Sequence, residues 1–240
     1  MKAMLLAAGR GDRMRPLTDS TPKPLLAAGG HRLIDYPLHA LARAGVGEVI
    51  INLSWHGEMI RAYAGDGGRY GLALHYSEEG PVPLETGGGI HRALAMLGGD
   101  AFLLVNGDVW TDLPLESLQL PSGSLAQLVL VANPAHHPDG DFALDADGRI
   151  VAGGPRFTYS GIAIIDPGLF AGCEPGRFPL KPLLDRARTA GRLTGTLWTG
   201  HWLDIGTPER LAALDRDLRS GRLRHPALAA AGARNDAAEG

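Results

Sequence analysis

Short apolar runs alternate with amphipathic segments through the first half of the chain. Glycine, proline and other turn residues bound the apolar runs, which is typical of buried strands. These runs predict strands at residues 3–8, 48–53, 72–76, 102–105 and 126–131. The intervening segments repeat their apolar residues every three or four positions, as helices with one buried face do. They predict helices at residues 33–44, 56–64 and 89–97.

This alternation of strands and helices predicts the α/β class. We expect a doubly wound, mostly parallel central sheet of Rossmann-like form, with right-handed crossovers that place helices on both faces. In such sheets ligands bind beyond the carboxyl ends of the strands. Polar residues at strand ends are therefore candidates for function.

The later part of the chain is richer in strands. Residues 142–154 alternate apolar and polar positions around an Asp-Gly pair, which predicts a hairpin. The further elements expected are a strand at 158–166, a helix at 179–190, a strand at 193–198, and a short strand followed by a helix within 201–219. We expect a small β-rich subregion here.

The chain has 240 residues, which fits one domain. We place that domain at residues 1–224. Residues 225–240 are rich in alanine and have no clear periodicity, so we expect a flexible C-terminal tail there.

Composition and charge exclude several classes of partner. The formal net charge is -3, whereas nucleic-acid-binding domains carry a basic stripe. No apolar run approaches the ~20 residues of a membrane helix, and the single cysteine, Cys173, cannot form an internal disulfide. We therefore expect a cytoplasmic protein that binds neither nucleic acid nor a membrane.

A cluster of cations on a glycine-rich turn follows the first predicted strand. Residues 5–24 are LLAAGRGDRMRPLTDSTPKP. Successive backbone N–H groups of a glycine turn can form an anion-binding nest, and Arg13 and Lys23 can reach a polyphosphate from two sides. The stretch therefore favours a nucleoside triphosphate as ligand. Its candidate nucleotide-binding residues are Gly9, Gly11, Asp12, Arg13 and Lys23.

Two other phosphate-binding motifs fit this stretch less well. A dinucleotide-binding G-x-G-x-x-G would need a third glycine where the chain has Met14, and a helix where it has Pro16. A Walker loop would need Gly-Lys followed by Ser or Thr, which this stretch lacks. We interpret Arg10 and Arg15 as solvated neighbours of the two functional cations.

Two aspartates come at the ends of predicted strands. Asp108 follows the strand at 102–105, and Asp204 ends the apolar run of HWLD. One such aspartate is often a turn or cap residue. Two of them in a chain that binds a triphosphate favour Mg²⁺, because this ion takes one or two carboxylates together with substrate phosphates. Asp108 and Asp204 are thus the candidate metal ligands.

The stretch PLETGGGIHRAL combines an acid, a hydroxyl and three glycines at the start of a predicted helix. Glycines there let a flat base approach the backbone, whose N–H groups can read it. The candidate residues for this contact are Glu85, Thr86 and Gly88. A plain helix cap by Thr86 is the alternative.

Two further features are less specific. Asn106 precedes Asp108 by two residues, so in a strand both side chains face the same way. The adjacent His136 and His137 have no nearby cysteine or spaced acidic partner, so we interpret them as loop residues rather than metal ligands.

The N-terminal stretch resembles the signature of the sugar-1-phosphate nucleotidyltransferases. The matching pattern is Leu-Ala-Ala-Gly-x-Gly-x-Arg-Met-x-Pro-Leu-Thr at residues 6–18, followed by Pro-Lys-Pro-Leu at residues 22–25. The resemblance covers residues 1–218 and implies transfer of a nucleotidyl group from an NTP to a sugar 1-phosphate. It makes Arg13 and Lys23 the catalytic cations: Arg13 holds the leaving end of the triphosphate, and Lys23 binds the α-phosphate or the sugar phosphate.

The resemblance also implies roles for other positions. Asp108 and Asp204 match the carboxylates that hold Mg²⁺, and the stretch around Glu85 matches the part that lies on the nucleobase. The residues that match sugar-phosphate contacts are Asn106, Gly140, Ser160 and Gly161.

Details of the motifs narrow the choice of nucleotide and of sugar. The form LETGGGI is most similar to that of pyrimidine-using members, which implies UTP. Many relatives carry Glu-Lys-Pro where this chain has Gly153-Gly154-Pro155, which disfavours glucose and mannose. With NGDVWTD and YSGI, these features resemble the members that act on N-acetylmuramate 1-phosphate. The alternatives are guanylyl transfer to mannose 1-phosphate, thymidylyl transfer to glucose 1-phosphate, and a non-catalytic nucleotide-sugar sensor. Monomer and homo-oligomer are both open.

Overall fold

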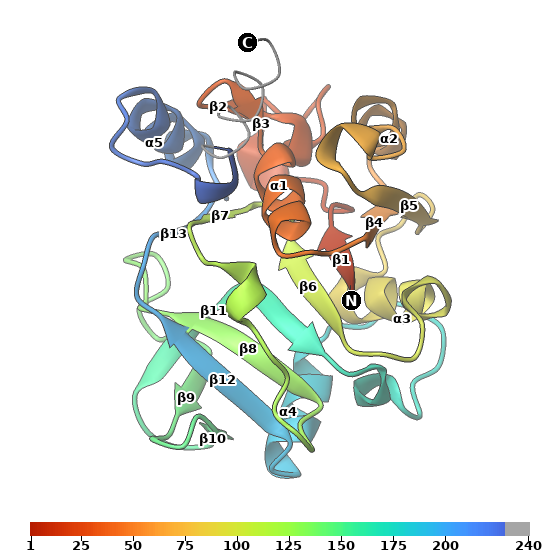
Figure 1. The fold of residues 1–240 in the computed structure, drawn as a ribbon, viewed down its shortest axis with the longest axis vertical. Helices are drawn as coiled ribbons and strands as arrows, with labels where there is room; N and C mark the ends of the chain where they lie inside the picture. The colour runs from red at the N-terminus through yellow and green to blue at the C-terminus, as the bar shows by residue number, and fades with distance from the viewer. Residues whose placement is uncertain (229–240) are drawn as a thin grey trace, which may run out of the picture.

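The computed structural model describes residues 1–228 and is built on one central sheet (Figure 1). The strand order is β10-β9-β11-β6-β1-β4-β5, with β8 paired to β11 and β12 paired to β8. The strands are β1 (Lys2–Leu6), β4 (Glu48–Leu53), β5 (Ala73–Glu78), β6 (Phe102–Asn106), β8 (Ala126–Val131), β9 (Phe142–Leu144), β10 (Ile150–Val151), β11 (Arg156–Ile165) and β12 (Leu193–Trp198). Strands β1, β4, β5 and β6 are parallel, as are β8 and β12, and β11 is antiparallel to its partners. The predicted α/β class with a mostly parallel sheet is confirmed.

Helices cover both faces of this sheet. Side chains alternate along a strand, so Leu5 and Met4 of β1 belong to apolar cores on opposite faces. The helices on the face of Leu5 are α1 (Asp35–Arg43) and α2 (Gly57–Ala64), and those on the face of Met4 are α3 (Glu85–Leu97) and α4 (Lys181–Thr189). Burial on both faces explains why the central strands are continuous apolar runs.

A third apolar cluster joins the N-terminal loop to the last helix. It includes Met14, Trp110 and Leu214. The elements around it are α5 (Pro208–Arg219), the two-stranded sheet of β7 (Val109–Thr111) and β13 (Trp202–Asp204), and the two-stranded sheet of β2 (Ala27–Ala28) and β3 (His31–Arg32). Single 3₁₀ turns lie at Asp12–Met14, Lys23–Leu25, Gly68–Tyr70, Leu115–Ser117 and Pro167–Phe170. The cluster thereby holds the glycine-rich loop beside α5.

Several element boundaries differ from the predictions, and two of the differences, in β1 and α3, have a packing reason. Strand β1 ends at Leu6, because the N–H of Ala7 donates to Oδ1 of Asn52 (2.7 Å) instead of continuing the ladder. Helix α3 begins at Glu85, four residues before the predicted start at residue 89. Three glycines lie in this first part of the helix although glycine disfavours helices. They are needed there because neighbouring segments leave no room for side chains.

The C-terminal boundary also lies later than expected. His225 and Ala227 fall within the predicted tail but are only 6% and 8% exposed. The ring of His225 packs edge-on against Tyr36 and Trp110. The ordered packing therefore extends past residue 224, and the predicted tail beyond residue 228 lies outside the described residues.

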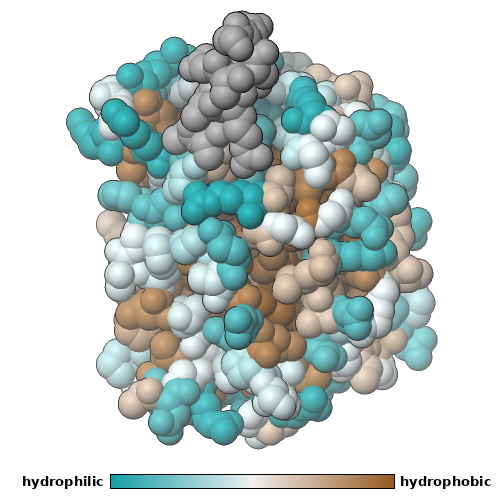
Figure 2. All heavy atoms as spheres, in the orientation of Figure 1, coloured by the Kyte–Doolittle hydropathy of each residue, from teal (hydrophilic) through white to brown (hydrophobic). Residues whose placement is uncertain are grey.

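The surface is mixed in character. On the face drawn in Figure 2, polar side chains separate several small apolar patches, which is normal for a folded protein surface. Among the helices of residues 1–228, none has the length and apolar character needed to cross a membrane.

Candidate functional site

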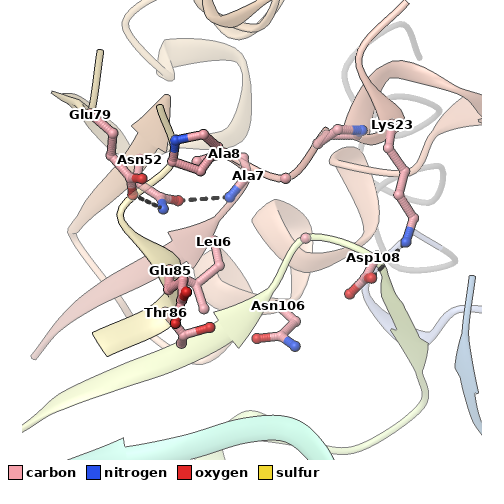
Figure 3. Close-up of a pocket in the computed structure, with 14 residues that line it drawn as sticks. Leu6, Ala7, Ala8, Lys23, Asn52, Glu79, Glu85, Thr86, Asn106 and Asp108 are labelled. Carbon is pink, nitrogen blue, oxygen red and sulfur yellow. Dashed lines mark hydrogen bonds and ion pairs between the residues drawn. The ribbon is translucent and has the colours of Figure 1, made fainter. Parts of the chain in front are cut away.

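Two cavities lie side by side at the carboxyl ends of β1 and β6. The first, of about 270 Å³, is bounded by the loop after β1 and the start of α3 (Figure 3). The second, of about 340 Å³, lies between the end of β6, strand β11 and strand β13. Asn106 and Asp108 line both cavities, so the two spaces share a wall. This is the sheet edge at which the α/β pattern predicts a ligand.

The glycine-rich loop brings part of its predicted set to these cavities. Gly9 lines the first cavity, and a Cβ built on it would meet only open space. Gly11 has a positive φ of 68° and packs against Thr18, whose hydroxyl donates to the Gly11 carbonyl (2.8 Å). Gly11 therefore shapes the turn, and only Gly9 of the two glycines borders the ligand space.

The three arginines of this loop have different surroundings. Arg13 lines the second cavity and makes no ion pair within residues 1–228. Arg15 pairs with Asp12 (3.3 Å) and Asp19 (3.4 Å), and Arg10 lies over the ring of Trp55. The interpretation of Arg10 and Arg15 as neighbours of Arg13 agrees with this arrangement. The expected nucleotide contact of Asp12 does not, because its carboxylate faces Arg15 and borders neither cavity.

Lys23 and Asp108 form an ion pair between the two cavities. Nζ of Lys23 lies 2.6 Å from Oδ2 of Asp108, and the two side chains are 11% and 35% exposed. Lys23 comes from the turn between Pro22 and Pro24, and Asp108 follows the end of β6. Limited water access strengthens the attraction between the two charges. The pair places a fixed cation and a carboxylate at the shared wall.

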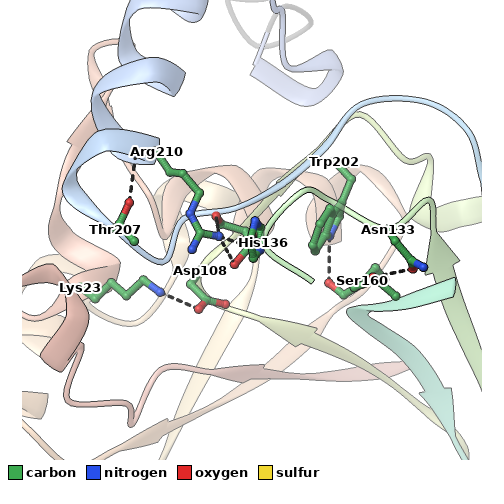
Figure 4. Close-up of polar contacts among 10 residues, drawn as sticks. Lys23, Asp108, Asn133, His136, Ser160, Trp202, Thr207 and Arg210 are labelled. Carbon is green, nitrogen blue, oxygen red and sulfur yellow. Dashed lines mark hydrogen bonds and ion pairs between the residues drawn. The ribbon is translucent and has the colours of Figure 1, made fainter. Parts of the chain in front are cut away.

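Asp204 reaches the second cavity from a strand outside the central sheet. Strand β13 pairs with β7, which follows Asp108 directly, and the N–H of Ile205 donates to the Asp108 carbonyl (2.8 Å). The carboxylate of Asp204 accepts from Arg210 and contacts Nε2 of His136 at 3.1 Å (Figure 4). The two candidate metal ligands thus border one cavity, although only Asp108 lies at the end of a central strand.

The donor set of this wall fits a Mg²⁺ ion. Asp108 and Asp204 offer carboxylate oxygens from two adjacent segments, and Mg²⁺ takes one or two such groups and completes its shell with phosphate and water. Within residues 1–228 there is no cluster of three or more His, Cys, Asp or Glu side chains that would hold a metal alone. The donor set is therefore of the kind that shares an ion with substrate phosphates.

A buried network behind the first cavity was not foreseen from the sequence. Asn52 accepts from the N–H of Ala7 through Oδ1 and donates through Nδ2 to Oε1 of Glu79 (2.6 Å). Oε2 of Glu79 accepts from the N–H of Leu84 (2.6 Å). Asn52 and Glu79 are 4% and 8% exposed and both line the cavity. The signal available in the sequence was Asn52 itself, a polar residue near the end of the apolar stretch EVIINL.

The start of α3 contributes Glu85 and Thr86 to the first cavity. Glu85 has a positive φ of 61°, rare for a residue with a side chain. The helix-cap alternative for Thr86 is not realised, because α3 has no side-chain cap hydrogen bond. Gly88 is packed tightly against a neighbouring segment: its N–H donates to the Phe178 carbonyl (3.0 Å), and a Cβ on it would lie 2.2 Å from the Gly176 carbonyl oxygen. Gly88 therefore serves packing, and its base contact stays a prediction.

The second cavity contains most of the predicted sugar-side residues. Asn106, Ser160 and Gly161 line it. Gly161 has a φ of 80°, and a Cβ there would lie 2.5 Å from Nδ2 of Asn106, so only glycine lets the asparagine rest against β11. Gly140 is not on this wall: a Cβ on it would lie 2.7 Å from Oδ1 of Asn133. Gly140 therefore packs within its loop, and its sugar contact stays a prediction.

Two histidines and a tyrosine complete the second cavity. His136 and His137 lie in a loop, as expected, but both border the cavity and have acidic partners in space, Asp204 and Asp141 (each 3.1 Å). Asp204 could not be recognised from the sequence as a partner of His136, because the two residues are far apart in the chain. Burial, reinforced by Asp141, raises the pKa of the Tyr159 phenol, which has no hydrogen-bond partner in the described structure. Tyr159 therefore stays neutral.

Comparisons with known proteins identify the family of this chain. The model of the nucleotidyl transferase family matches residues 2–142. The chain is 48% identical to N-acetylmuramate alpha-1-phosphate uridylyltransferase of Neisseria meningitidis serogroup B, over 88% of this chain and 95% of that protein. It is 34% identical to the protein of the same name from Caulobacter vibrioides, over 88% and 94%.

Solved structures show the same fold. The inositol-1-phosphate CTP transferase from T. maritima superimposes with a TM-score of 0.76 and 20% identity, over 91% of this chain and 94% of that chain.

One assignment follows from the N-terminal signature, the two joined cavities with their cations and carboxylates, and the match over residues 2–142. The chain belongs to the nucleotidyl transferase family.

Proposed function

We propose that this protein transfers the uridylyl group of UTP to N-acetylmuramate 1-phosphate, giving UDP-N-acetylmuramate and pyrophosphate. The observation that carries the proposal is the pair of joined cavities, with Lys23 and Asp108 on the wall between them. A reaction between two bound substrates needs such a junction, because the attacking and the attacked atoms must meet there. The choice of substrates rests on the 48% and 34% identity to the two uridylyltransferases.

The first cavity suits the nucleotide. Its floor is the backbone of Ala7 and Ala8, held by Asn52, and its rim carries Glu85 and Thr86. A uracil ring needs a flat apolar surface with a few polar groups at its edge, and this cavity offers both. Gly9 leaves space for the triphosphate to pass close to the backbone.

The second cavity suits the sugar phosphate. Asn106 and Ser160 offer hydrogen-bonding groups for hydroxyl and amide substituents, and Trp202 adds an indole ring. The indole N–H of Trp202 donates to the Ser160 carbonyl (3.0 Å), which fixes the ring beside the cavity. Arg13 borders the same space, where it can meet a phosphate.

The reaction itself is an in-line displacement. An oxygen of the sugar phosphate forms a bond to the α-phosphorus of UTP while the bond from that phosphorus to the bridging oxygen of pyrophosphate breaks. Lys23 and Arg13 offset the charge on the reacting phosphates. Asp108 and Asp204 would hold a Mg²⁺ ion, which neutralises phosphate charge as a Lewis acid when bound. A phosphate dianion is already nucleophilic, so no side chain has to act as a base.

This activity would place the protein in the cytoplasm, where UTP is found, and in the recycling of peptidoglycan sugars. A non-catalytic sensor would not need Lys23, Asp108 and Asp204 together on one wall. The test is pyrophosphate release with a matrix of UTP, GTP and dTTP against N-acetylmuramate, mannose and glucose 1-phosphates. We expect turnover to be highest with UTP and N-acetylmuramate 1-phosphate. Turnover of mannose 1-phosphate with GTP and none with this pair would refute the proposed substrates, and no turnover at all would favour the sensor.

A further inference from the structure

We propose that Arg210 determines the sugar specificity by binding the lactyl carboxylate of the acidic sugar, with His136 supporting the contact. This inference rests on the proposed function, since only an acidic sugar presents that group. Arg210 lies in the first turn of α5, and its N–H donates to the side chain of the N-cap residue Thr207. The capped N-terminus of α5 therefore fixes the position of the Arg210 backbone, from which the side chain extends.

The guanidinium of Arg210 contacts two residues that line the second cavity, although Arg210 itself is not one of the lining residues. Its Nη1 donates to the carboxylate and the carbonyl of Asp204 and lies 3.0 Å from Nε2 of His136 (Figure 4). Asp204 and His136 both line the cavity. A Cβ on Gly206 would lie 3.0 Å from Nη2 of Arg210, so this glycine leaves room for the guanidinium. The group is thus held in place on the sugar side, away from the nucleotide.

The unused donors of Arg210 suit a carboxylate. Every hydrogen bond of its guanidinium to residues 1–228 is made by Nη1, which leaves Nε and Nη2 without a partner there. Two neighbouring guanidinium N–H groups form the planar fork that binds a carboxylate in a bidentate manner. The side chain is 23% exposed, so it is ordered but reachable.

The charges around the second cavity favour an acidic sugar over a neutral one. Lys23 and Arg210 each pair with one of the two candidate metal ligands, Asp108 and Asp204. A divalent cation on those carboxylates would offset their charge and leave both side chains with attraction for substrate anions. Lys23 borders the first cavity and serves phosphate. Arg210 lies on the sugar side, where a neutral sugar offers only the phosphate that both sugars share and no second anion.

The test compares two sugars that differ only in the lactyl ether. We would measure kcat/KM for N-acetylmuramate 1-phosphate and N-acetylglucosamine 1-phosphate with UTP, in the wild type, Arg210→Gln and Arg210→Lys. The matched control is Arg219→Gln, which removes the same charge from the exposed side of α5, where Arg219 pairs with Asp215. Thermal melts check that each variant is folded. Binding of each sugar phosphate by calorimetry, without UTP and with Mg²⁺ present, gives a readout besides activity.

We expect Arg210→Gln to lower the ratio of kcat/KM for the acidic over the neutral sugar by about 10- to 100-fold, through a higher KM for the acidic one. Calorimetry should show weaker binding of the acidic sugar alone, Arg210→Lys should lie between, and Arg219→Gln should match the wild type. If Arg210→Gln slows both sugars equally, the ratio of their kcat/KM values stays unchanged, and Arg210 acts only on Asp204. That result would overturn this inference and leave the proposed function intact. A wild type that does not use N-acetylmuramate 1-phosphate would refute the proposed function and this inference with it.

Discussion

The ammonium group of Lys23 lies 2.6 Å from a carboxylate oxygen of Asp108, although 85 residues separate the two in the chain. Lys23 is the more buried partner, at 11% side-chain exposure against 35%. Each group holds the other at the junction of the two cavities. One contact therefore joins the cation proposed to bind phosphate with a carboxylate proposed to hold the metal.

Replacing Lys23 should affect activity far more than stability. We expect Lys23→Ala to lower kcat by at least about 100-fold, because a preorganised charge at the reacting phosphate is lost. The free energy of unfolding should fall by less than about 2 kcal/mol, since the exposed part of Asp108 can be hydrated in its place. Pyrophosphate release and urea unfolding measure the two effects. Lys181→Ala, which removes an exposed lysine paired with Asp185, is the control. Near-normal turnover of Lys23→Ala would exclude Lys23 from catalysis.

Asp204 should be needed for activity and for metal dependence. Asp204→Asn keeps the size of the side chain but removes its charge, so we expect turnover to fall by about 100-fold or more and the Mg²⁺ concentration for half-maximal rate to rise. Titration of Mg²⁺ in the pyrophosphate assay measures both. Asp139→Asn, an exposed aspartate of the 132–141 loop, should leave them unchanged. If Asp204→Asn keeps the Mg²⁺ requirement of the wild type, Asp204 is not a metal ligand.

The Asn52–Glu79 network should support both folding and UTP binding. Glu79→Gln has one acceptor oxygen where the native residue has two, so the N–H of Leu84 or the Asn52 amide loses its partner. We expect a loss of about 1–3 kcal/mol in unfolding free energy and a higher KM for UTP with a smaller change in KM for the sugar phosphate. Urea unfolding and initial rates test this. The neighbouring Glu78→Gln, at a half-exposed pair with Arg61, is the control, and equal effects of the two variants would contradict the prediction.

Stability should depend on pH through His225. Burial, with nearby His39 and Arg43, lowers the pKa of His225 to about 4 from its ordinary 6.5. Between these values the unfolded chain binds the proton and the folded chain does not, so the free energy of unfolding falls as pH drops through this window. The loss below pH 4 amounts to roughly 3 kcal/mol, and the contribution is complete above pH 6.5.

His225→Phe keeps an aromatic ring and removes the titration. We therefore expect the wild type to lose more stability than His225→Phe between pH 7.5 and pH 5, as measured by urea unfolding at both values. His75→Gln, a variant of an exposed histidine, should follow the wild type. Parallel pH curves for wild type and His225→Phe would show that His225 does not carry this dependence.

The sequence by itself determined the elements of the fold. Runs of apolar residues and their spacing predicted β4 and β8 with the observed limits, and predicted a helix within 201–219, where α5 lies. These features depend on residues close together in the chain, whose preferences act locally. The cations and carboxylates on the cavity wall were also predictable, since Arg13, Lys23 and Asp108 carry recognisable motifs.

Tertiary structure alone decided how distant residues combine. The sequence could not show that Asn52 and Glu79 brace the first cavity, that the N–H of Gly88 donates to the Phe178 carbonyl, or that His136 and Arg210 meet at Asp204. Each of these contacts joins segments that are far apart in the chain and adjacent only after the sheet has assembled. Local patterns fix which residues form strands and helices, whereas the packing of whole elements determines which side chains face the same cavity.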